Sequence, residues 1–88
     1  MAIDLPTVDV LRRAKIVTTD QIKCAVELYM ENPEIGAHPI AEGYVINLKA
    51  AVKSCEWAWK VARDPAASVS LKRGSIWTAI LLARAQQA

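Results

Sequence analysis

Apolar residues recur at helical spacing in three long stretches of this chain, and each stretch begins at a polar residue that can cap a helix. Thr18-Thr19-Asp20-Gln21 fits a capping box, in which the Thr and a Gln three residues later each bond the backbone N–H of the other. The helix should end before Pro33, because the residue before proline avoids the helical region. Its apolar stripe consists of Ile22, Ala25, Val26, Tyr29 and Met30.

The other two stretches lie in the second half of the chain. Asn47 is expected to cap a helix that continues to Asp64-Pro65. Ser68 or Ser70 should cap the last helix, about residues 70–87, whose middle at residues 76–83 is apolar nearly all round. A helix that is apolar on every side must be covered on every side.

The remaining segments are shorter, and we also interpret them as helical. Asp4 can cap a first helix that ends near residue 14. Pro39 can start one or two helical turns, which Gly43 can end in a left-handed conformation. No alternation of apolar and polar residues of useful length appears, so the predicted fold is all-α, a compact bundle of about five helices. The 88 residues form a single domain, 1–88, in this interpretation.

Two stretches of the chain resemble each other. Residues 14–26 and 42–52 each read as a turn, two β-branched or aromatic residues, a polar cap and an apolar-periodic helix. We therefore expect two helix-turn-helix repeat units, at about residues 8–31 and 35–62, each covering the stripe of the other. Repeated units of this kind build binding surfaces more often than catalytic sites.

The repeat resembles a known family, the N-terminal MshEN or GspE-N-like domain of type II secretion and type IV pilus assembly ATPases. The family's unit has a Leu-Gly pair, a short helix, a Gly, two aliphatic residues, a polar cap and a longer helix. The second copy matches this order at Ile35-Gly36, Pro39-Ile40, Gly43, Tyr44-Val45 and Leu48. The first copy matches at Val10-Leu11, Ile16-Val17, Thr18, Gln21-Ile22 and Val26.

Members of that family with a complete double motif bind cyclic di-GMP through an Arg, the short helix and a terminal Gln. The resemblance thus implies a bacterial protein and a ligand turn at Gly36 and Gly43. Here Glu34 stands where the second motif has Arg, and a carboxylate repels a phosphate. A cyclic-dinucleotide-sensing module is therefore an alternative function, with cyclic di-GMP binding disfavoured.

Composition narrows the function classes. The formal charge of +2 is too small to indicate a nucleic-acid partner by itself. Cys24 and Cys55 have neither metal-ligand spacing nor a secretion signal beside them, which favours buried reduced thiols in a cytoplasmic protein. The longest uncharged run, residues 74–83, is far shorter than the roughly 20 residues of a membrane span.

Candidate catalytic chemistry is sparse in this sequence. His38 is the single histidine, and no second His or Cys lies near it in the chain. We find no glycine-rich phosphate loop, paired-carboxylate motif or Ser-His-Asp set. We therefore expect no enzyme, no cofactor and no bound metal.

Arg12, Arg13 and Lys15 form a candidate basic patch. A third function is a small DNA-binding regulator of helix-turn-helix type, with residues 10–15 as the first helix, a turn at residues 16–18 and residues 19–30 as the recognition helix. The recognition helix would then carry three acidic residues, Asp20, Glu27 and Glu31, and a single basic residue. This balance disfavours nucleic acid as the partner.

The three Trp carry the most functional information, since the chain has no Phe and a small core cannot easily cover them all. Trp59 lies on the main stripe of its helix, whereas Trp57 and Trp77 lie on secondary stripes. We expect an interface built from Trp57, Val61, Trp77 and Leu81. The predicted function is a non-enzymatic protein–protein interaction or regulatory module that forms homo-oligomers.

Overall fold

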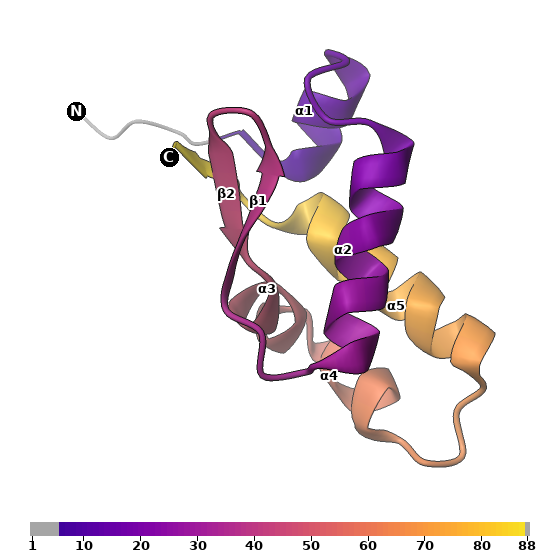
Figure 1. Ribbon diagram of the computed structural model, residues 1–88. Coiled ribbons are helices and arrows are strands. Elements are labelled where there is room, and N and C mark those ends of the chain that lie inside the picture. Colours follow the sequence, from indigo (N-terminus) through magenta and orange to yellow (C-terminus); the bar gives the residue numbers. More distant parts are fainter. Residues whose placement is uncertain (1–5, 88) are drawn as a thin grey trace.

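Five helices surround one side of a small antiparallel sheet (Figure 1) in a computed structural model that describes residues 6–87. The predicted cap Asp4 lies outside these residues. In chain order the elements are α1 (Val8–Arg13), α2 (Thr19–Glu31), β1 (Ala37–Ala41), β2 (Tyr44–Asn47), α3 (Leu48–Ser54), α4 (Glu56–Arg63), α5 (Val69–Leu82) and β3 (Gln86–Gln87).

The sheet makes the all-α prediction wrong, and the error begins at residues 36–43. This segment is no short helix: β1 and β2 form a hairpin around Glu42-Gly43, in which Pro39 pairs with Val45 and Ala41 with Tyr44. Gly43 does adopt the expected left-handed conformation, with φ of 82°, but it turns a hairpin. Pro39 is tolerated because β1 is an edge strand, where an N–H can be missing without the loss of a hydrogen bond between two inner strands.

The C-terminal segment supplies the third strand, so the predicted helix over 70–87 is too long. α5 ends at Leu82, and the extended residues that follow join two parts of the fold. The Val8 amide donates to the Ala83 carbonyl and the Ala85 amide to the Pro6 carbonyl, each at 2.9 Å. Gln86 and Gln87 then pair with Val45 and Tyr44 of β2. These long-range bonds compete successfully with continuation of the helix.

The predicted caps of three helices are confirmed. The Thr18 hydroxyl accepts from the Gln21 amide at 3.1 Å while the Gln21 side chain accepts from the Thr18 amide at 2.8 Å. Asn47 caps α3 through the Ala50 amide, and Ser68 caps α5 through the Leu71 amide. The first helix is capped by Thr7. Local signals therefore located where helices begin even where the fold class was wrong.

The single helix predicted between Asn47 and Asp64 is broken at Cys55, which has extended backbone angles (φ −96°, ψ 102°). Val52 and Ala58 are both fully buried. Six residues apart on one continuous helix, they would point about 120° apart around its axis. The break lets both face the core. The second predicted repeat unit is thus a hairpin followed by two short helices, and does not repeat the helix-turn-helix of α1 and α2.

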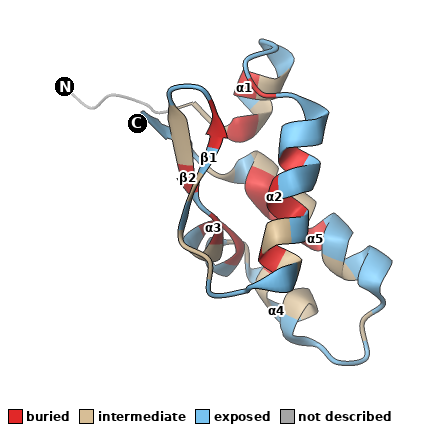
Figure 2. Ribbon diagram, viewed as in Figure 1, coloured by how far each residue is buried: buried red, intermediate tan, exposed pale blue. Residues whose placement is uncertain are grey.

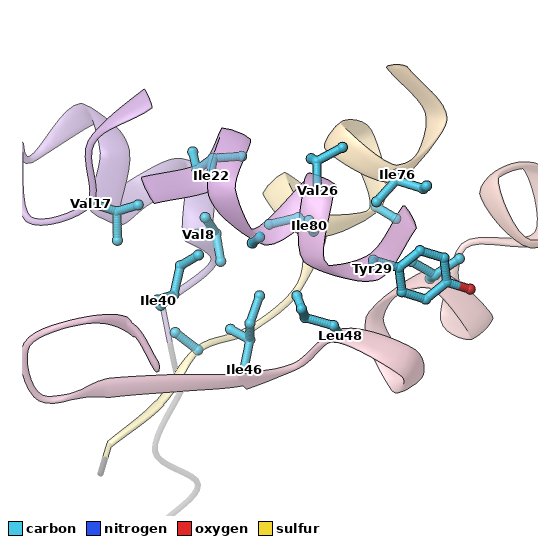
Figure 3. Close-up of a cluster of buried hydrophobic side chains, with 14 of the residues drawn as sticks. Val8, Val17, Ile22, Val26, Tyr29, Ile40, Ile46, Leu48, Ile76 and Ile80 are labelled. Carbon is cyan, nitrogen blue, oxygen red and sulfur yellow. The ribbon is translucent and has the colours of Figure 1, made fainter. Parts of the chain in front are cut away.

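The core lies where α2, α5 and the hairpin face one another, as the red positions of Figure 2 indicate. Figure 3 shows aliphatic side chains from every layer meeting there: Ile22 from α2, Ile40 and Ile46 from the hairpin, and Ile76 and Ile80 from α5. Ser75 is the polar exception among the buried residues of the described chain, and its hydroxyl donates to the Lys72 carbonyl at 2.8 Å. One side of α5 is thereby fixed in the core.

Candidate functional site

The side of α5 that faces away from the core is the most unusual surface of the described chain. Helical spacing places Ser70, Gly74, Trp77 and Leu81 on it, opposite the buried Ile76 and Ala79. No charged residue occurs from Gly74 to the end of the helix. An outward helix face in a small soluble domain normally carries charges. Residues 76–81 are nonetheless buried or half-buried, so the chain itself provides much of the expected coverage, and Leu82 is the exposed position within residues 76–83.

The Thr78 hydroxyl beside this face is bonded within the helix. Thr78 Oγ1 donates to the Gly74 carbonyl at 3.0 Å. Gly74 has no side chain, and a Cβ built on it would meet nothing within 4 Å. The surface beside Trp77 is therefore apolar in character and open above the glycine.

A groove of about 390 Å³ runs between this face and α2, and we call it the α2–α5 groove. Trp77 is partly buried and packs against the core while it lines the groove. Its lining residues are Lys23, Val26, Glu27, Arg73, Gly74 and Trp77. The groove thus offers an indole, an aliphatic side chain and the stems of charged residues to a ligand.

An ion pair connects the two helices at the groove. Arg73 Nε lies 2.8 Å from Glu27 Oε1, and Arg73 Nη2 lies 3.1 Å from Glu27 Oε2, so the guanidinium binds the carboxylate with two nitrogens. Both side chains are half exposed, and such a pair adds little to stability because water screens it. Its main effect is to neutralise one rim of the groove.

The four predicted interface residues fall into two groups. Trp77 and Leu81 lie on the outward side of α5, and both pack partly on the core. Trp57 and Val61 lie on α4, where Trp57 is 50 % exposed and Val61 is partly buried. Trp59 packs on the core, and the Arg63 guanidinium lies 4.9 Å from its ring centroid. Of the α5 pair Trp77 lines the α2–α5 groove, whereas the α4 pair belongs to a separate helix.

A second groove, of about 550 Å³, lies between α3 and the end of α5. Four of its lining residues are alanines, whose short side chains leave the space open. Leu82, which is 64 % exposed, also lines it. Its lining residues are Ile46, Asn47, Ala50, Ala51, Ser54, Cys55, Ala79, Leu82, Ala83, Arg84 and Gln86. The sequence did not predict this groove, because it depends on the break at Cys55 and on the end of α5 at Leu82. Neither position is marked by a glycine or a proline.

The candidate ligand turn at Gly36 and Gly43 is not one turn. The two glycines lie at opposite ends of β1, on the order of 20 Å apart for an extended strand. The Gly36 carbonyl accepts the Leu48 amide at 3.0 Å, and the Ile35 carbonyl accepts the Lys49 amide at 3.1 Å. The first amides of α3, which a phosphate would need, are thus occupied by the chain itself.

The candidate basic patch is partly neutralised. Arg12 and Arg13 both pair with the Asp9 carboxylate, at 3.0 and 3.1 Å. Lys15 follows α1 with a left-handed backbone, φ 63°. Arg12, Arg13 and Lys15 therefore come together at the end of α1 with one carboxylate among them, while α2 presents Asp20, Glu27 and Glu31 to solvent.

Titratable groups give little sign of catalytic tuning. Burial lowers the pKa of the His38 imidazole from its ordinary value of 6.5. Burial, and next the Glu34 carboxylate, raise the pKa of the Tyr29 phenol, while Lys49 opposes them. Among residues 6–87 no three or more His, Cys, Asp or Glu side chains group as metal ligands. Both cysteines are free, and Cys24 is exposed where burial had been expected.

Within the described chain no helix has the length and apolar character needed to cross a bilayer. Comparisons with protein-family models, with curated proteins and with solved structures find no match to this chain. The resemblance to the MshEN domain therefore stays a prediction.

Proposed function

We propose that this protein is a non-enzymatic interaction module that presents the outward side of α5 to a protein partner. The observation that carries the proposal is the uncharged face around Trp77, combined with the α2–α5 groove beside it. Contiguous apolar surface with a polar rim is typical of protein-binding sites. The free thiols favour a cytoplasmic location, where they would stay reduced.

Trp77 is suited to be the anchor of such an interface. A partly buried indole is held by its own fold before binding, so little side-chain entropy is lost on association. Tryptophan is enriched among the residues that dominate binding energy, and these are usually surrounded by groups that exclude water. Lys23, Glu27 and Arg73 can supply that polar surround.

No observation favours the two alternative functions over this one. A nucleotide would meet the Glu34 carboxylate and the occupied amides at the start of α3. A DNA duplex would meet the acidic exposed residues of α2. We therefore propose neither of them.

Site-specific photo-cross-linking in the native host tests the proposal. Trp77 is replaced by the photoreactive residue benzoylphenylalanine, and Glu42, exposed at the tip of the hairpin, carries the same group in a control variant. We expect a discrete cross-linked protein from position 77, absent from position 42 and abolished when Gly74 is also changed to Trp. Equal or absent cross-linking at both positions would contradict the proposal.

A further inference from the structure

The outward side of α5 has the spacing of a coiled-coil seam. Ser70, Gly74, Trp77 and Leu81 follow one another at intervals of four, three and four residues, as the inward positions of paired helices do. Along the helix their side chains run small, small, large, large. This order has a definite consequence for what can cover the seam.

We propose that the partner of this face is a second copy of the chain, docked so that the two α5 helices run antiparallel about a two-fold axis. The inference rests on the proposed function and names its partner. With the axis between residues 75 and 76, Trp77 of each copy lies over Gly74 of the other. Leu81 in the same way lies over Ser70. Every large side chain thereby meets a small one, and the contact is the same from both sides.

A parallel pair fails the same test. It would set Trp77 against Trp77 and Gly74 against Gly74, which crowds one layer and leaves a void in the next. Voids and overpacking both destabilise a contact because dispersion contacts are lost or strained. The open space above Gly74 is the matching hollow that the antiparallel pair fills.

Charges do not oppose this arrangement. The seam itself has none, and the nearest cation, Arg73, already binds Glu27 in its own chain. Thr78 lies beside the seam with its hydroxyl bonded to the Gly74 carbonyl, so it brings no unsatisfied donor to the contact. Two identical surfaces can therefore approach without mutual repulsion.

The area available sets the strength of the association. A stable dimer buries about 800 Å² on each partner, which is about one seventh of the 5659 Å² exposed by this chain. The 14 residues of α5 give a seam roughly 21 Å long, so the rim from Lys23 and Glu27 must contribute as well. We expect a reversible dimer at the weak end of specific interfaces.

Sedimentation equilibrium measures the dimer, from about 10 µM to about 1 mM, the range for small interfaces. Gly74→Trp places an indole against the partner's Trp77 and should weaken dimerisation at least about tenfold. The Cβ of the new residue would meet nothing within 4 Å in its own chain. Val69→Trp is the matched control: it adds the same indole at an exposed position of α5 outside the seam, and should leave the dimer unchanged.

Disulfide formation between two single-cysteine variants tests the register. In a background with Cys24→Ser and Cys55→Ser, which removes both native thiols, Ser70→Cys and Leu81→Cys chains are oxidised alone and mixed. We expect a 70–81 disulfide in the mixture, mapped by peptide mass spectrometry, and little dimer from either variant alone. A dimer from Ser70→Cys alone would indicate a parallel pair and overturn the inference.

These outcomes separate the inference from the function on which it rests. If the wild type is monomeric throughout the concentration range and position 77 cross-links to a different protein, the proposed dimer is wrong and the proposed function as an interaction module stands. A monomer without any specific cross-link at position 77 overturns both.

Discussion

Lys15 holds the one positive φ found at a non-glycine position of the described chain, 63°. It ends α1 in a Schellman arrangement: the Ile16 amide donates to the Leu11 carbonyl and the Lys15 amide to the Arg12 carbonyl. Glycine usually occupies this position, because a Cβ disfavours the left-handed conformation. The chain therefore stores a small strain at the end of its first helix.

Replacing Lys15 by glycine should raise the free energy of unfolding. Relief of the left-handed strain is worth roughly 1–2 kcal/mol, and the greater freedom of unfolded glycine offsets roughly 0.5–1 kcal/mol of it. Urea denaturation should show a net gain of about 0.5–1 kcal/mol. Lys15→Ala removes the charge and keeps the Cβ, so a similar gain in that variant would show that charge, not backbone, is responsible.

His38 should make stability depend on pH. Because burial lowers the pKa of the folded imidazole below 6.5, folding favours its neutral form. Near neutral pH the imidazole is neutral in both states and contributes nothing. As pH falls through 6.5 the unfolded chain binds its proton first, and the free energy of unfolding decreases until the folded pKa is passed.

The measurement compares wild type with His38→Gln by urea denaturation between about pH 7 and pH 5, around the ordinary histidine pKa. Carboxylates titrate in both proteins, so the difference between them isolates the imidazole. We expect the wild type to lose stability relative to the variant as pH falls. A constant difference would contradict the assignment.

At the scale of elements, two glycines give a matched test of backbone conformation. A Cβ at Gly43 or at Gly74 would meet nothing within 4 Å, so space does not distinguish them. Gly43 turns the hairpin with φ of 82°, whereas Gly74 lies inside α5. Gly43→Ala should cost about 1–2 kcal/mol of stability, and Gly74→Ala should add about 0.5–1 kcal/mol. Thermal denaturation giving shifts of the same sign would refute this account.

The elements also show how far local sequence signals reach. Thr18 with Gln21, Asn47 and Ser68 announced three helix starts, because a cap acts on amides only two or three residues away. The hairpin was missed because its strands have five and four residues, too few for an alternating pattern to stand out. Pro39 was assigned to a helix start although an edge strand accepts proline equally well. The break at Cys55 depends on Val52 and Ala58 reaching one core, which no local signal reports.

For the whole molecule, stability should depend on the inward side of α5. Ile80 is fully buried between α2 and the hairpin, and Ile80→Ala should cost about 2–5 kcal/mol. Leu82, two residues later and 64 % exposed, is the control, and Leu82→Ala should change stability by less than about 0.5 kcal/mol. Chemical denaturation of both variants makes the comparison. Equal losses would mean that the core is not where the structure places it.

The candidate site was only partly predictable because it forms between distant segments. Trp77 and Leu81 were expected at an interface from helical spacing alone, and the structure places both half-buried on α5, where they pack partly on the core. The Arg73–Glu27 pair joins residues far apart in sequence, so no local pattern could propose it. The grooves likewise depend on how α2 and α3 pack on α5. Spacing along one helix can be read from a sequence, whereas the neighbour of that helix cannot.

The bonds that join Pro6 and Val8 to Ala85 and Ala83 have a consequence for biosynthesis. A ribosome delivers residues 6–8 well before residues 83–85. Val8 is fully buried in the finished fold. Its apolar side chain stays exposed until residues 83–85 have left the exit tunnel. Contacts of such long sequence separation also slow folding, because a large loop must close first. Completion of this fold therefore waits until the segment after α5 has left the ribosome, and residues 6–8 lack these partners during that interval.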